Sequence, residues 1–212
     1  MSSAPGGLYH VLTLAGEGQS RIEDRHSVFF GYAFPCRSEE ELKEKLKEVA
    51  GRHPKARHIV YAARFYPGTE KAHDAGEPAY TAGLPILEAL RHEDLYDAAV
   101  IVARLFGGIL LGKGGLIRAY GKAAREALAQ APKETRRWTV PLTLSVPYDL
   151  WPRLKEALSR EGLSIEPPLF ADKVTFTLWV PGDRKEDLRR FLTDIAKGDL
   201  QLEEGAGTLR PL

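Results

Sequence analysis

A nearly continuous apolar segment followed by a glycine-rich loop constrains the fold of this chain more than any other feature. Residues 98–106 read Ala-Ala-Val-Ile-Val-Ala-Arg-Leu-Phe. Such a run is typical of a strand covered on both faces, because it lacks the apolar–polar alternation of a half-exposed strand. Five glycines follow within nine positions, and an alanine-rich helix pattern continues over residues 116–131. The order strand, loop, helix predicts a sheet that packs against helices.

The first 131 residues predict one domain of mixed α+β class. Its strands are expected at residues 8–14, 25–34, 57–65 and 98–106, and its helices at 38–51, 81–91 and 116–131. Ser38 stands where an N-cap is needed, and Glu41 three residues later completes a capping box. A polar loop over residues 67–78 leads into the second helix. The resulting element order is ββαβαβα.

The pattern changes after residue 131. Residues 132–138 are charged and begin with Pro132, so we expect a linker there. Residues 139–212 then predict a second domain, whose first strand alternates Val140, Leu142, Leu144 and Val146. Helices are expected at 149–160 and 183–197, and further strands at 163–166, 173–180 and 200–204. The order βαββαβ within about 70 residues is typical of a ferredoxin-like fold.

Composition and charge exclude several classes of protein. Lys and Arg number 30 against 29 Asp and Glu, and neither half of the chain is strongly basic. A general electrostatic attraction to nucleic acid is therefore not expected, and any anion site must be a local cluster. No apolar run approaches the ~20 residues of a membrane span, and residues 1–7 lack signal-peptide character. The single cysteine, Cys36, rules out an internal disulfide and a cysteine-based zinc cluster. We expect a cytoplasmic protein, and we predict no membrane partner, no metal and no other cofactor.

The glycine-rich loop predicts an anion-binding site. Residues 107–113 fit Gly-x-x-x-x-Gly-Lys, but the next position, which holds a metal-binding Ser or Thr in a nucleotide-hydrolase loop, is Gly114. Glycines let backbone amides approach an anion, and the following helix adds partial positive charge beside Lys113 and Arg118. The alternative is a tight turn that needs glycine for positive φ. Five glycines exceed what one turn requires, so binding is favoured.

The acidic loop Asp-Ala-Gly-Glu-Pro at residues 74–78 leaves two interpretations open. Asp74 or Glu77 could act as a general base or hydrogen-bond a ribose. They could equally complement the dipole of the helix that follows, with Thr81 as its cap. Among six histidines none has metal-ligand spacing, and His58, at the start of a strand, is the one that we retain as a candidate site residue.

Both loops together resemble the IMPACT family, bacterial YigZ branch. The resemblance is carried by Arg-Leu-Phe-Gly-Gly at 104–108, Gly-Gly-Leu at 114–116, Arg-Ala-Tyr at 118–120 and the block at 74–83. Shorter matches are Ser-Arg-Ile at 20–22 and Lys-Ala-Arg-His at 55–58. Two departures stand out: Ala75 replaces the second aspartate of the family's acidic block, and Leu105 replaces an aromatic residue.

The resemblance implies a first domain similar to domain IV of elongation factor G, with a left-handed crossover, and a link to translation. We therefore expect a binding protein whose partner is RNA, a ribosomal element or a nucleotide or phosphate ligand; the oligomeric state stays open. The rival hypothesis is an enzyme acting on a nucleotide or small phosphorylated substrate, with Asp74 or Glu77 as base. The predicted anion contacts are Arg104, Gly107, Gly108, Gly112, Lys113, Gly114, Gly115 and Arg118, supported by Arg21, His58, Asp74, Gly76, Glu77, Thr81 and Tyr120.

Overall fold

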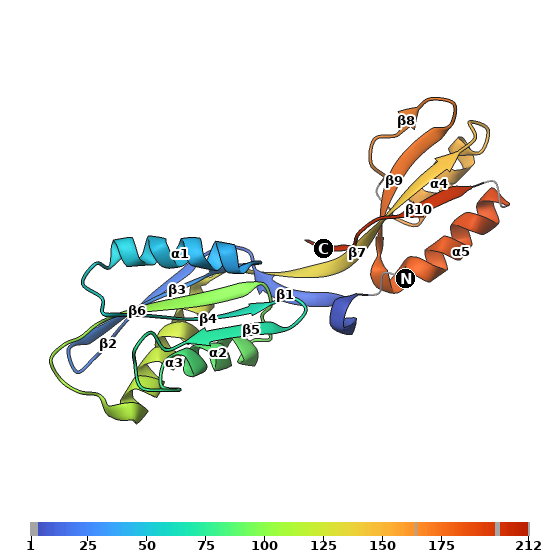
Figure 1. Ribbon diagram of the computed structural model, residues 1–212. Helices are drawn as coiled ribbons and strands as arrows, with labels where there is room; N and C mark the ends of the chain where they lie inside the picture. Colours follow the sequence, from blue (N-terminus) through green and yellow to red (C-terminus); the bar gives the residue numbers. More distant parts are fainter. Residues whose placement is uncertain (1–3, 164, 198–199, 212) are drawn as a thin grey trace. The chain divides into compact units, whose positions relative to one another are not determined.

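The chain divides into two compact units. The computed structural model describes residues 4–163, 165–197 and 200–211 (Figure 1). The N-terminal unit is Val11–Thr135, and the C-terminal unit is Arg136–Leu212 together with the residues up to His10. The two units form a mixed α+β protein, as predicted.

The predicted linker at 132–138 is wrong, because strand β7 (Lys133–Val146) begins there. Strand β11 (Thr208–Pro211) pairs with residues 136–139 of β7, and the Trp138 amide donates to the Tyr9 carbonyl at 2.8 Å. These backbone bonds outweigh the charged composition that suggested a loop. The boundary between the two units falls within β7 and within β1 (His10–Leu14). Strands β1 and β7 are neighbours in one sheet.

The N-terminal unit is built on an antiparallel five-stranded sheet of order β2-β3-β6-β4-β5. Strand β6 (Ala98–Leu105) lies at its centre, which explains its apolar sequence. Strands β3 (Ser27–Pro35) and β4 (His58–Phe65) flank it, and both run antiparallel to β6. The edges are β2 (Gly18–Asp24) and β5 (Thr69–His73), two strands that the sequence pattern did not predict.

Helices cover both faces of this sheet (Figure 1). Helix α1 (Glu39–Arg52) begins at the predicted capping box, in which the Ser38 hydroxyl accepts from the Glu41 amide at 3.2 Å. Its apolar side packs on a cluster that includes Phe34 and Ile101. Helices α2 (Gly83–His92) and α3 (Gly112–Gln130) share the larger cluster on the other face.

Helix α3 packs on the sheet at backbone distance. A Cβ on Gly18 would lie 2.2 Å from the Ala127 carbonyl oxygen, and one on Gly31 would lie 2.8 Å from the Ala123 oxygen. The Ser20 hydroxyl donates to that same Ala123 oxygen at 2.7 Å. Glycines on the strands and alanines on the helix therefore set the spacing between the two layers.

The C-terminal unit follows the predicted order with two corrections. Around β7 lie β9 (Val174–Pro181), β10 (Gln201–Glu204) and β11, and β8 (Leu169–Phe170) pairs with β9. The helices are α4 (Trp151–Arg160) and α5 (Lys185–Ala196), with short 3₁₀ turns at Pro5–Gly7 and Gly182–Arg184. The strand predicted at 163–166 is instead a single bridge from Ile165 to Leu178, and Ser164 lies outside the described residues. The strand found in that part of the chain is β8, and β11 is a further strand that the sequence pattern did not predict.

Within the described ranges, no helix combines the length and the apolar character needed to cross a membrane.

Candidate binding site

A cleft of about 420 Å³ lies in the N-terminal unit where β6 gives way to α3. Three predicted segments meet there: the end of β6 with the start of α3, the acidic loop before α2, and the start of β4. The residues that line it are Arg57, His58, Glu77, Pro78, Arg104, Phe106, Leu110, Leu111, Gly112, Lys113 and Leu116.

A buried ion pair lies in the wall of the cleft. Arg104 Nη1 donates to Glu77 Oε1 at 2.7 Å, and the two side chains are only 6% and 4% exposed. The Tyr120 hydroxyl donates to the same carboxylate oxygen at 2.7 Å. The Arg104 guanidinium also lies 5.5 Å from the Phe29 ring centroid and 5.4 Å from that of Phe106. Arg104 was predicted to contact an anion directly; its charge is instead matched by Glu77.

Tyr120 serves as a hydrogen-bond donor at this site. Its side chain is fully buried, with its ring edge-on to Phe29 at 5.0 Å. Burial raises the pKa of Tyr120 far above its ordinary value, and the hydrogen bond to Glu77 raises it further. The phenol therefore keeps its proton at neutral pH.

The acidic loop is held by its own backbone contacts. Asp74 Oδ1 accepts from the amides of Ala82 and Gly83 at 3.0 and 2.8 Å, and Oδ2 accepts from the Tyr80 amide at 2.9 Å. Desolvation raises the pKa of Asp74, but these three amides outweigh it and the pKa lies below its ordinary value of 3.8. Asp74, rather than Thr81, caps the start of α2.

Other predicted supporting residues stabilise the same loop. The Thr81 hydroxyl donates to the Pro78 carbonyl at 2.7 Å, and His58 Nδ1 lies 2.9 Å from the Ala75 carbonyl oxygen. Gly76 has φ of +85°, which favours glycine, and a Cβ there would lie 3.6 Å from the His58 ring. The loop at 74–83 is thus a compact turn against β4.

The start of α3 is the part of the cleft suited to an anion. The helix begins at Gly112, four residues earlier than predicted, so Gly112, Gly114 and Gly115 belong to its first turn. Its N-cap residue, Leu111, supplies no side-chain cap, and Gly112, Lys113 and Gly114 are exposed. First-turn amides and the helix dipole favour a negative group at such a position, next to Lys113.

The remaining glycines of the loop have structural roles. A Cβ on Gly107 would lie 2.0 Å from the His26 carbonyl carbon, so this glycine permits contact with the β2–β3 turn. Gly115 is buried against the Leu111 side chain. Gly108 has φ of +85° and gives the loop its turn.

Two of the predicted basic residues lie away from the cleft, and the predicted anion contacts Gly107, Gly108, Gly114 and Gly115 are not among its lining residues. Arg118 lines a separate groove beside α2, and Arg21 lines another beside the end of α3 and forms a 3.5 Å ion pair with Glu23. Conversely, Arg57 and Leu110 line the cleft and were not predicted. Arg57 adjoins His58 in the segment at 55–58 that resembles the IMPACT family. That resemblance is the sequence signal from which Arg57 could have been predicted.

The described residues offer little for metal or thiol chemistry. Among them, no group of three or more His, Cys, Asp or Glu side chains is placed to hold a metal ion. Burial raises the pKa of the Cys36 thiol to about 12, so it is protonated at neutral pH.

Known proteins resemble this chain over both units. Residues 25–128 match the family model of the Impact N-terminal domain, and residues 144–199 match a domain of unknown function, DUF1949. A Thermus thermophilus protein described as an IMPACT family member in the pol 5' region is 37% identical, covering 84% of this chain and 98% of its own length. The IMPACT family member YigZ of Escherichia coli is 30% identical, covering 77% and 82%.

A solved structure described as that of a hypothetical protein supports the same relationship. It is 28% identical, with a TM-score of 0.66, and the match covers 92% of this chain and 97% of that one. The predicted resemblance is confirmed: the chain belongs to the IMPACT family.

Proposed function

We propose that this IMPACT family protein is a translation-associated binding protein that takes a single-stranded RNA segment into the cleft at the start of α3. The observation that supports this most directly is the uncapped, exposed first turn of a 19-residue helix, flanked by Lys113 and Arg57 at an apolar cleft. A phosphate would accept from the amides of that turn, as anions do at helix N-termini.

The apolar part of the cleft suits a nucleobase. Phe106 is 48% exposed and Leu110 79% exposed, although both are large apolar side chains next to a cationic surface. An unpaired base can stack on an exposed ring, whereas a base inside a duplex cannot reach one. The mixture of cationic and apolar lining therefore favours single-stranded RNA over a duplex.

Catalysis is supported less well, because both candidate bases are already bonded. Asp74 accepts three backbone hydrogen bonds, and Glu77 is paired with Arg104 and Tyr120. One observation favours the rival enzyme: Glu77 lines the cleft. Release of phosphate or of a new product from nucleoside triphosphates, lost in Glu77→Gln, would favour that rival.

The experiment is a titration of 5′-fluorescein-labelled 12-nucleotide oligouridine followed by anisotropy between 50 and 300 mM KCl. Arg57→Ala/Lys113→Ala should weaken binding at least tenfold, while Lys43→Ala/Lys47→Ala, which removes equal charge from α1 on the other face of the sheet, should not. Equal binding by both double variants overturns the proposed site. Sucrose-gradient cosedimentation with ribosomes tests the translation link separately, and absence of ribosome association for the unaltered protein overturns that part.

A further inference from the structure

A second apolar groove lies between α2 and α3, and it shares no lining residue with the cleft. Its volume is about 370 Å³. Three of its large apolar side chains are open to solvent: Tyr80 is 73% exposed, Ile117 44% and Leu84 38%. Large apolar side chains gathered around a groove, rather than scattered singly, mark an interaction surface. The full lining is Tyr80, Leu84, Pro85, Glu88, Ile117, Arg118, Gly121 and Arg125.

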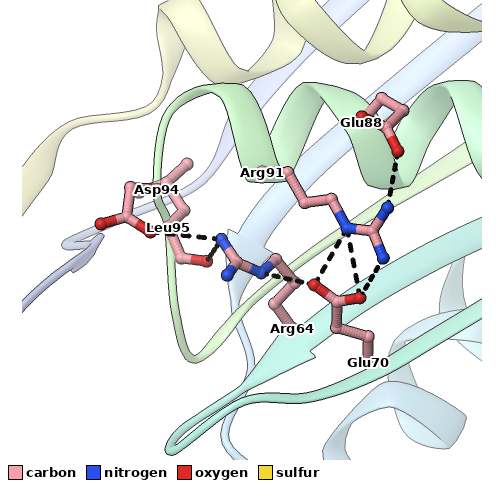
Figure 2. Close-up of polar contacts among 6 residues, drawn as sticks. All are labelled: Arg64, Glu70, Glu88, Arg91, Asp94 and Leu95. Carbon is pink, nitrogen blue, oxygen red and sulfur yellow. Dashed lines mark hydrogen bonds and ion pairs between the residues drawn. The ribbon is translucent and has the colours of Figure 1, made fainter. Parts of the chain in front are cut away.

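The charge at this groove is unbalanced. Arg118 and Arg125 have no ion-pair or hydrogen-bond partner among the described residues. The carboxylate in the lining, Glu88, accepts from Arg91 at 2.6 Å. Figure 2 shows that Arg91 also binds Glu70, which is paired in turn with Arg64 (Nε to Oε1, 3.0 Å). Glu88 therefore belongs to a network that ties α2 to β4 and β5, and the two arginines of α3 are left free.

The backbone before α2 is strained at Tyr80, whose ring is exposed to solvent. Tyr80 has φ of +65°, a left-handed conformation that residues other than glycine rarely adopt. The Asp74 carboxylate fixes it by accepting the Tyr80 amide hydrogen. A strained backbone that presents an exposed aromatic ring is typical of a contact position.

Gly121 keeps the floor of the groove open. It lies in the middle of α3, where glycine is less favourable than alanine. A Cβ there would meet no backbone atom, but would come within 3.1 Å of the Arg125 guanidinium and 3.7 Å of the Pro85 side chain. Packing of the protein itself thus does not require glycine, whereas an occupant of the groove would.

We propose that this groove binds an acidic protein segment, whose large apolar side chains fill the groove while its carboxylates pair with Arg118 and Arg125. Guanidinium groups bind carboxylates through paired hydrogen bonds, and a segment with spaced apolar anchors is the usual occupant of a groove between helices. RNA fits this groove less well, because its other apolar walls, Leu84, Pro85 and Ile117, are not flat faces for stacking.

The test selects 16-residue peptides from a random displayed library on the full chain, with Arg118→Glu/Arg125→Glu as counter-selection. The enriched peptides should carry Asp or Glu beside at least two large apolar residues. The tightest of them should bind the double variant and Gly121→Leu at least tenfold more weakly than the unaltered chain. Lys43→Glu/Lys47→Glu, with the same charge change on α1, should leave its affinity within twofold.

The proposal would be overturned by no enrichment over the counter-selection, by enriched peptides without acidic residues, or by equal binding to the groove variants and the α1 control. Circular dichroism and the oligouridine titration show whether each groove variant remains folded with its cleft intact. Loss of oligouridine binding in Arg118→Glu/Arg125→Glu but not in Gly121→Leu would assign the arginines to RNA, and would also overturn it.

Discussion

Removal of Arg104 leaves the buried Glu77 carboxylate without its cationic partner. Such a loss costs about 3–5 kcal/mol, because the remaining charge is neither solvated nor paired. Arg104→Met should therefore lower the free energy of unfolding in urea by that amount at pH 7. Arg104→Met/Glu77→Leu removes both charges and should recover much of the loss. A double variant no more stable than the single one would contradict this account of the pair.

At the same scale, Asp74 predicts a pH dependence of stability. Its folded-state pKa lies below 3.8, so its contribution is fully present above pH 3.8 and is lost as the pH falls through the folded value. Asp74→Asn should reduce the unfolding free energy by about 1 kcal/mol at pH 6, the usual loss for a helix cap, and by less near pH 2. The measurement is urea unfolding from pH 2 to 7, with exposed Asp172→Asn as control. A difference independent of pH would refute the assignment.

Single residues were predicted unevenly from the sequence. The acidic loop and the glycine segment were identified because several polar and glycine residues are adjacent in the chain. The burial of Arg104 was not, because an apolar strand covered on both faces shows no alternation that assigns its charged residue to one side. Its partner Glu77 is 27 positions away, and only the sheet order brings β6 beside the loop that precedes α2.

Glycines near helix α3 are of two kinds: a Cβ added to one kind would meet backbone atoms, and a Cβ added to the other would meet only side chains. Gly18→Ala places a Cβ against α3 backbone and should lower stability by more than 2 kcal/mol, since backbone must shift. Gly121→Ala, whose added Cβ would meet only side-chain atoms of Arg125 and Pro85, should raise stability by roughly 0.5–1 kcal/mol through helix propensity. Thermal unfolding of both variants checks this pair. Similar changes in melting temperature would show that the close approach is not required.

The elements that the sequence did not predict are those whose stability comes from pairing. Strands β2 and β5 form the two edges of the sheet and are mostly polar, as edge strands commonly are, so they lack an apolar signal. The first turn of α3 was predicted as loop because glycine disfavours helices, and tertiary packing overrides that preference. The buried strands and α1, by contrast, carry their own periodicity and caps.

For the whole molecule, a net charge of +1 limits how RNA binding can depend on salt. Besides Arg104, whose charge is matched by Glu77, the cationic side chains Arg57 and Lys113 line the cleft. Each phosphate contact on a single strand contributes about −0.7 to the slope of log K against log salt concentration. The expected slope is thus about −1.4, and near zero for Arg57→Ala/Lys113→Ala. A slope steeper than about −4 would require a larger basic surface than the cleft provides.

The division of the chain into units also fixes an order of assembly during synthesis. The Tyr9 carbonyl accepts a hydrogen bond from the Trp138 amide, which is made about 130 residues later. At 5–20 residues per second, that interval is about 6–26 s. All of Val11–Thr135 is made within this interval, so the N-terminal unit can fold before the strand that pairs with the segment at Tyr9 has been made. The C-terminal unit, which includes the residues up to His10, is therefore completed after the N-terminal unit has been made.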